Sequence, residues 1–306
     1  MDGLMSDFEL TVTEQERASG QLEADRLHQT ALLLHAAGYV VLRDLLPLQL
    51  VDNLRKAFAV VFDDCVASKQ GDVWYQVSRV TRAVFWERAA RWRIFPKLRP
   101  PFDDAALLAN TLVTSLVAEL LGHDFICKFV SSDTCVRGSR LQAPHRELSA
   151  GGAGRPCAYI VNVPLSLSGL DNGPLEIWPG GTHHWQPELL TRYGISDDVQ
   201  DDDNPRMEAF AQAFPSRKLI LEPGSVLIRD PGMLHRGTPN LSDEPRTMLT
   251  ICYTTKQHGH DYGDLSYNFD DVIYVGLPDP VKLLFAASIK APAAVSPPDR
   301  SWARRL

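Results

Sequence analysis

The order of helical and strand-like segments along the chain is the feature that most restricts its fold. Segments with apolar residues at helical spacing come first, and they are Leu22–Ala37, a segment that opens at Pro47, and Asp103–Leu121. After Gly122 the chain changes to short segments rich in β-branched and aromatic residues, separated by turns that contain Gly, Pro, Asn and Asp. Strands that gather after the helices, instead of alternating with them, predict a β-sandwich or barrel backed by helices.

The strand-like segments are Tyr39–Leu42, Phe125–Val130, Cys157–Leu167, Leu219–Ile228 and Thr247–Tyr253. In Cys157–Leu167, every second residue from Tyr159 to Leu165 belongs to an apolar series, which predicts a strand with one buried face.

The segments together predict a single domain over residues 1–306. It has a helical N-terminal part (20–122), a β core (123–256) and a C-terminal extension (257–306). An insertion at 187–217 interrupts the β core and carries the acidic run 197–203. This insertion is most simply a solvated excursion, and a lid over a site is the alternative.

Composition limits the classes of partner. Of 306 residues 44% are hydrophobic, enough for a sizeable core. The formal charge of −7 argues against nucleic acid, and mildly against a polyanionic substrate such as a CoA thioester. We therefore expect a small-molecule partner, and the sequence makes no prediction of the oligomeric state.

The chain also lacks the marks of a membrane or secreted protein. Its longest apolar stretch, Ala31–Leu42, is interrupted by His35 and Gly38 and is too short to span a bilayer. The first thirty residues are unlike a secretory signal, and five cysteines without a CxxC pair indicate no disulfide framework. We expect a cytoplasmic location.

Residues 142–147 and 235–246 contain the candidates for a metal site and for a cosubstrate-binding arginine. In an extended segment His145 and Glu147 point to the same side, so they can hold one metal ion together. His235 follows a strand and a Pro-Gly turn, where a lone histidine is more often a core residue than a ligand. Two histidines and one carboxylate leave three metal positions open, the arrangement of non-haem Fe(II) oxygenases. Arg246 offers a bidentate fork to the far carboxylate of a keto-acid cosubstrate.

These residues, with Asp171-Asn172-Gly173-Pro174-Leu175 and Pro179-Gly180-Gly181-Thr182-His183, resemble the phytanoyl-CoA dioxygenase (PhyH) family over about residues 22–256. The resemblance implies a mainly β fold with flanking α-helices, a cupin-like double-stranded β-helix or jelly roll. It also implies dependence on Fe(II), 2-oxoglutarate and O2.

By this resemblance His145, Glu147 and His235 are the catalytic metal ligands. Arg246 pairs with the C5 carboxylate of 2-oxoglutarate, and Gln142 contacts the same cosubstrate.

The chain departs from the family pattern at three positions. Glu147 stands where the family usually has Asp, and its carboxylate argues against a halogenase. Leu175 and Gly237 stand where some relatives have a hydroxyl residue that helps to bind the cosubstrate.

Substrate contacts are expected from aromatic residues in loops. Trp74 and Tyr75 precede the third helix, and Trp178 flanks the PGGTH turn; ordinary packing is the alternative for each. The acidic run 197–203 suits a neutral or cationic substrate. The expected reaction is hydroxylation, desaturation or oxidative ring closure that tailors a natural product in secondary metabolism, such as antibiotic biosynthesis, with a sugar-containing product as one option.

Two other functions stay open at this point. One is a non-catalytic jelly-roll scaffold that retains a metal pocket, and the other is a cupin-type metal-dependent hydrolase or isomerase. Arg246 disfavours both, because neither needs a keto-acid arginine.

Overall fold

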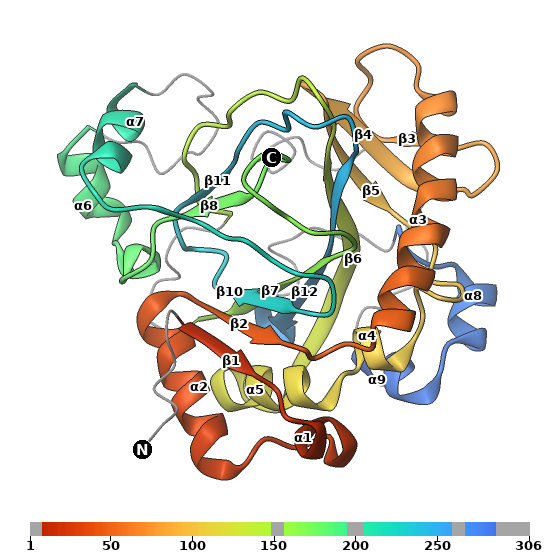
Figure 1. Ribbon diagram of the computed structural model, residues 1–306, viewed down its shortest axis with the longest axis horizontal. Helices are drawn as coiled ribbons and strands as arrows, with labels where there is room; N and C mark the ends of the chain where they lie inside the picture. The colour runs from red at the N-terminus through yellow and green to blue at the C-terminus, as the bar shows by residue number, and fades with distance from the viewer. Residues whose placement is uncertain (1–7, 148–155, 195–204, 259–266, 286–306) are drawn as a thin grey trace.

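Two β-sheets face each other across a cavity, and helices cover the outer side of the larger sheet (Figure 1). The computed structural model describes residues 8–147, 156–194, 205–258 and 267–285. The arrangement confirms the predicted mainly β, helix-flanked jelly roll.

Within these residues the larger sheet has nine strands, and every neighbouring pair except β1 and β2 is antiparallel. Their order across the sheet is β1 (Glu9–Thr11), β2 (Tyr39–Arg43), β10 (Val226–Arg229), β7 (Ala158–Pro164), β12 (Arg246–Thr255), β6 (Phe125–Cys135), β5 (Arg91–Phe95), β4 (Val84–Arg88) and β3 (Gln76–Val77). The smaller sheet consists of β11 (His235–Gly237), β8 (Leu175–Ile177) and β9 (Arg217–Lys218).

The helices fall into two groups (Figure 1). One group lies along the larger sheet and is represented in the main apolar core: α2 (Ala24–Ala37), α3 (Leu48–Ser68), α4 (Ala105–Leu108), α5 (Thr111–Leu121), α8 (Asp271–Gly276) and α9 (Asp279–Phe285). The other lies near the smaller sheet: α6 (Pro187–Arg192) and α7 (Pro205–Gln212). The short α1 (Glu14–Ser19) precedes them all. No helix in the described part of the chain is long and apolar enough to cross a membrane.

Local sequence signals explain the boundaries of α2 and α5. α2 ends at Gly38, whose left-handed backbone (φ 85°) lets its N–H donate to the carbonyl of Leu34. The side chain of Asn110 accepts hydrogen bonds from the N–H groups of Leu112 and Val113. This cap starts a new helix, so the single helix predicted over Asp103–Leu121 is two helices.

The strands differ from the prediction in burial and length. β7 is buried on both faces, not on one, because its outer face meets the helices and its inner face meets the smaller sheet and the cavity. Leu219–Ile228 forms a sheet strand only from Val226, because Leu221 instead makes an isolated bridge to Ser168. The N-terminal part 20–122 also contributes β2 to β5. Residues 197–203 lie outside the described ranges.

Strand register places polar residues in rows on the inner face of the larger sheet. Arg91 on β5 and Arg246 on β12 both pair with Cys135 on β6, so the three side chains share one row. Two residues along, Asp133 on β6 pairs with both Arg93 and Met248. These rows form one side of the site.

Candidate metal centre

Three side chains that the sequence singles out meet between the two sheets. Ligand atoms of His145, Glu147 and His235, here called the triad, all lie within 4.8 Å of one another. His145 and His235 exchange two backbone hydrogen bonds of 2.9 Å, and the N–H of Glu147 donates to the carbonyl of Pro231 at 2.8 Å. The HxE segment therefore runs antiparallel to β11, which turns both of its side chains toward His235.

Backbone carbonyls set the tautomer of both imidazoles. Nδ1 of His145 lies 2.9 Å from the carbonyl oxygen of Ala143, and Nδ1 of His235 lies 2.8 Å from that of Met233. A carbonyl oxygen only accepts, so each Nδ1 carries the hydrogen and donates. Each Nε2 then keeps its lone pair, the form in which histidine binds a metal.

Glu147 lies between His235 and a buried arginine. Its Oε1 is 3.3 Å from Nε2 of His235 and 3.5 Å from Nη2 of Arg229. Burial alone would raise the pKa of Glu147, but the hydrogen bond and charge of His235 in its protonated form, together with the charge of Arg229, outweigh burial and lower that pKa well below its usual range. Burial, aided by the charge of Arg229, lowers the pKa of His235 to about 4. Near neutral pH the triad is one carboxylate and neutral His235 beside a second imidazole, a donor set that suits a divalent cation.

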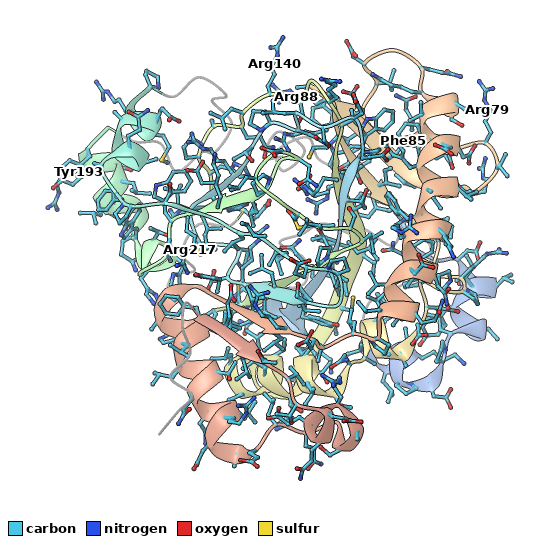
Figure 2. All side chains as sticks on the ribbon, viewed as in Figure 1. Arg79, Phe85, Arg88, Arg140, Tyr193 and Arg217 are labelled. Atoms are coloured by element: carbon cyan, nitrogen blue, oxygen red, sulfur yellow. The ribbon has the colours of Figure 1, made fainter. Side chains whose placement is uncertain are left out.

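The triad opens into a cavity of about 410 Å³ whose walls come from both sheets and from the 140–143 segment. Among its described lining residues, five are arginines and two are carboxylates: Arg88, Arg91, Arg93, Arg140 and Arg229, with Asp133 and Glu147. Arg88 and Arg140 are exposed and lie at the upper edge of the molecule in Figure 2. The cavity therefore has an excess of positive charge although the whole chain is acidic.

Arg246 lies behind the cavity wall, fully buried. Its Nε donates to the carbonyl of Gly173 at 2.9 Å, and its Nη1 lies 3.2 Å from Oδ2 of Asp133. The backbone of Gly173 is left-handed (φ 85°), and a Cβ there would lie 2.8 Å from Sγ of Cys135. The Asn-Gly-Pro turn thus needs glycine, and its carbonyl orients Arg246. Gln142 lines the cavity and accepts the N–H of Gly237 at 2.8 Å.

The predicted substrate-binding aromatics lie elsewhere: among the described residues, the cavity lining includes none of Trp74, Tyr75 and Trp178. Trp74 is 43% exposed, and the ring of Tyr75 packs 4.8 Å from that of Trp86. Trp178 is buried, and its Nε1 donates to the carbonyl of Ala211 on α7 at 2.7 Å. The hairpin and α7 supply the neighbours of these rings, and a substrate contact from any of the three stays a prediction.

The residues that do line the cavity beside the triad come largely from the β4–β5 hairpin and β6. Trp86, Arg91 and Arg93 belong to the hairpin, and Asp133 belongs to β6. The available sequence signal was the Arg-x-Arg alternation of β5, which places both arginines on one face of a strand. This alternation alone does not indicate a site, because the sequence does not show which strand pairs with β5.

Comparison with known proteins shows the family of the chain. The family model described as phytanoyl-CoA dioxygenase (PhyH) matches residues 34–248. Three similar solved structures are EvdMO1, EctD from S. alaskensis with bound Fe, and SnoN, a non-heme alpha ketoglutarate dependent epimerase from nogalamycin biosynthesis.

The three share the fold at low sequence identity: 19, 20 and 16%, with TM-scores of 0.53, 0.54 and 0.51. The matches cover 75, 77 and 76% of this chain, and half of EvdMO1, 78% of EctD and 85% of SnoN. With the family model matched over most of the β core, the chain belongs to the phytanoyl-CoA dioxygenase (PhyH) family and is an Fe(II)- and 2-oxoglutarate-dependent dioxygenase that uses O2.

Proposed function

We propose that His145, Glu147 and His235 bind the Fe(II) of this dioxygenase, and that it oxidises a C–H bond of a small natural product. One observation carries the metal assignment: two imidazoles whose Nδ1 atoms are bound to carbonyls are gathered around a partly buried carboxylate. With iron and 2-oxoglutarate bound, the centre would couple decarboxylation of the cosubstrate to oxidation of the substrate.

The remaining residues of the site hold these groups in place. Arg229 contacts Glu147, and Nε of Arg229 donates to Oδ1 of Asn162 at 3.2 Å. Asn162 on β7 thus holds Arg229 in place, and Arg229 orients the carboxylate of Glu147. Arg246 supplies the cation for the C5 carboxylate of 2-oxoglutarate. Gln142 lies on the wall beside the triad, where it can contact the same cosubstrate.

The cavity favours a substrate rich in oxygen acceptors. Its arginines donate hydrogen bonds and accept none, so hydroxyl, ether, carbonyl or anionic groups would be bound better than amines. A sugar-containing natural product offers many such acceptors. The charge of the lining gives no support to a cationic substrate, which we expected from residues 197–203.

Hydroxylation, desaturation and oxidative ring closure all start from the same C–H oxidation. SnoN, similar in fold, is an epimerase from nogalamycin biosynthesis by its description. That likeness supports the proposal that this chain acts in secondary metabolism.

An anaerobic titration tests the proposal. Fe(II) and then 2-oxoglutarate are added to the metal-free protein while the visible metal-to-ligand charge-transfer band is followed. The proposal expects a band that is lost in His235→Ala and weakened in Arg246→Ala. His123→Ala, a change of an exposed histidine, is the matched control and should keep the band. Iron binding without a band would overturn the cosubstrate assignment, and a band that survives in His235→Ala would overturn the ligand set.

A further inference from the structure

Arg91 on β5 lines the cavity beside the buried Arg246, which lies behind the cavity wall. The two residues share a register row through Cys135, and Arg91 is only 9% exposed. Its Nη2 donates to the carbonyls of Arg140 at 3.0 Å and Thr238 at 2.6 Å. Its Nη1 is buried and has no hydrogen-bond partner among the described residues, and the same holds for Nη2 of Arg246. Two buried guanidinium groups therefore each keep an unused donor atom.

Charge at this end of the cavity is also unbalanced. Asp133 lies two residues along β6 from the row that holds the two arginines, and it contacts Arg246 directly. The other lining carboxylate, Glu147, contacts His235 and Arg229 instead. Burial raises the pKa of Asp133, but the charges of Arg246 and Arg91 lower it overall. One carboxylate thus serves two buried cations, and a second anion would balance them.

Gly237 makes room for Arg91. An ideal Cβ at this position would lie 2.5 Å from Nη1 of Arg91 and 2.5 Å from Oε1 of Gln142. Any larger residue would push both side chains away from β11. The absence of a side chain at position 237 is thus what allows the donor atom of Arg91 to approach this wall.

We propose that Arg91 is a second arginine for the cosubstrate, and that Arg91 and Arg246 together hold the C5 carboxylate of 2-oxoglutarate, with Gly237 as the residue that admits Arg91. This inference rests on the proposed function of the same site. It makes a β4–β5 residue part of cosubstrate recognition in this chain.

Binding of two keto acids separates recognition from a purely structural role. Dissociation constants of 2-oxoglutarate and 2-oxopentanoate, which has a methyl group in place of the C5 carboxylate, are measured by anaerobic calorimetry on the Fe(II)-loaded enzyme. Arg91→Met should lower the affinity for 2-oxoglutarate at least about tenfold, as expected for loss of a hydrogen bond to a charged group. The same variant should leave the dissociation constant of 2-oxopentanoate within about twofold of the wild-type value, because that ligand lacks the contacted carboxylate.

Two further variants sharpen the test. Arg93→Met removes the same charge from the same strand and face, and should leave 2-oxoglutarate affinity within about twofold, because Arg93 has no contact with the C5 carboxylate in this proposal. Gly237→Ala displaces the tips of Arg91 and Gln142 together, and it should also lower the affinity for 2-oxoglutarate selectively. If Arg91→Met does not fold, Arg91→Lys replaces it: lysine keeps the charge but has no second nitrogen, so the affinity for 2-oxoglutarate should fall and that for 2-oxopentanoate should not.

The outcomes distinguish the two levels of the proposal. If the wild-type enzyme binds neither keto acid, the proposed function fails and the role of Arg91 fails with it. If the wild type binds 2-oxoglutarate but Arg91→Met weakens both keto acids equally or neither, the function stands and the role of Arg91 is overturned. A loss in Arg93→Met equal to that in Arg91→Met also overturns it, because the cause would then be the general charge of the cavity.

Discussion

Nε2 of His235 lies 3.3 Å from Oε1 of Glu147, and the carbonyl of Met233 holds the imidazole so that a lone pair faces the carboxylate. No proton bridges these two atoms in that tautomer, so they repel each other unless a cation lies between them. The relationship leads to the first two predictions.

Metal binding should stabilise the folded protein. A ligand present at about 100 times its dissociation constant adds about 2.7 kcal/mol to the free energy of unfolding. For a chain of this size the melting temperature should rise by about 4 °C on anaerobic addition of Fe(II). Differential scanning fluorimetry measures it. The rise should vanish in His235→Ala and persist in His123→Ala; an equal rise in both variants would place the metal elsewhere.

Replacing Glu147 with Gln should lower Fe(II) affinity at least about tenfold, because a neutral amide is a poorer ligand for a divalent cation than a carboxylate. The matched control is Glu176→Gln, which removes a buried carboxylate paired with Arg236 outside the triad. Its Fe(II) affinity should equal that of the wild type. Anaerobic competition with a metal-binding dye measures both constants. Unchanged affinity in Glu147→Gln would remove Glu147 from the ligand set.

Asp230 makes stability depend on pH. Burial raises its pKa to about 6, against 3.8 for an unperturbed aspartate. A raised folded-state pKa contributes stability below the unfolded pKa, and this contribution is lost as pH rises through the folded pKa.

Relative to Asp230→Asn, the free energy of unfolding of the wild type should therefore fall by about 2 kcal/mol between pH 4 and pH 7. Asparagine can still accept the 2.7 Å hydrogen bond from Gly232 N–H, so the comparison isolates the charge. Urea unfolding of both proteins across this range is the measurement, with Asp72→Asn in an exposed turn as the control. A constant difference between the wild type and Asp230→Asn would contradict the prediction.

Asn110→Ala should cost about 1 kcal/mol, because the amide oxygen accepts two of the first N–H groups of α5. The expected fall in melting temperature is about 1–2 °C, measured by calorimetry. Cosubstrate affinity should not change, since α5 packs on the outer face of the larger sheet. A fall in affinity would show that α5 affects the inner face.

Much of the site follows from short spacings in the sequence. His145 and Glu147 are two residues apart in an extended segment, so they face one way whatever the rest of the fold does. Helical spacing likewise predicted α2, and Gly38 predicted where it ends. The family resemblance supplied the remaining ligand and Arg246.

The aromatic residues show what such reasoning leaves undecided. Trp74 and Trp178 have the right side chains for a binding site, but whether a ring faces a cavity depends on which elements pack beside it. Here α7 accepts the indole N–H of Trp178, and Trp86 from the hairpin occupies the cavity wall instead.

The sequence by itself determined the helices, the strand-rich second half, and the His-x-Glu pair, because each depends on the periodicity of neighbouring residues. Only the tertiary structure decided that Arg91 lies in one row with Arg246, about 150 residues later in the chain. That row depends on β5 and β12 pairing with the same strand, β6. Backbone hydrogen bonds between strands are the same for any sequence, so local patterns do not choose the partner; the packing of the whole sheet does.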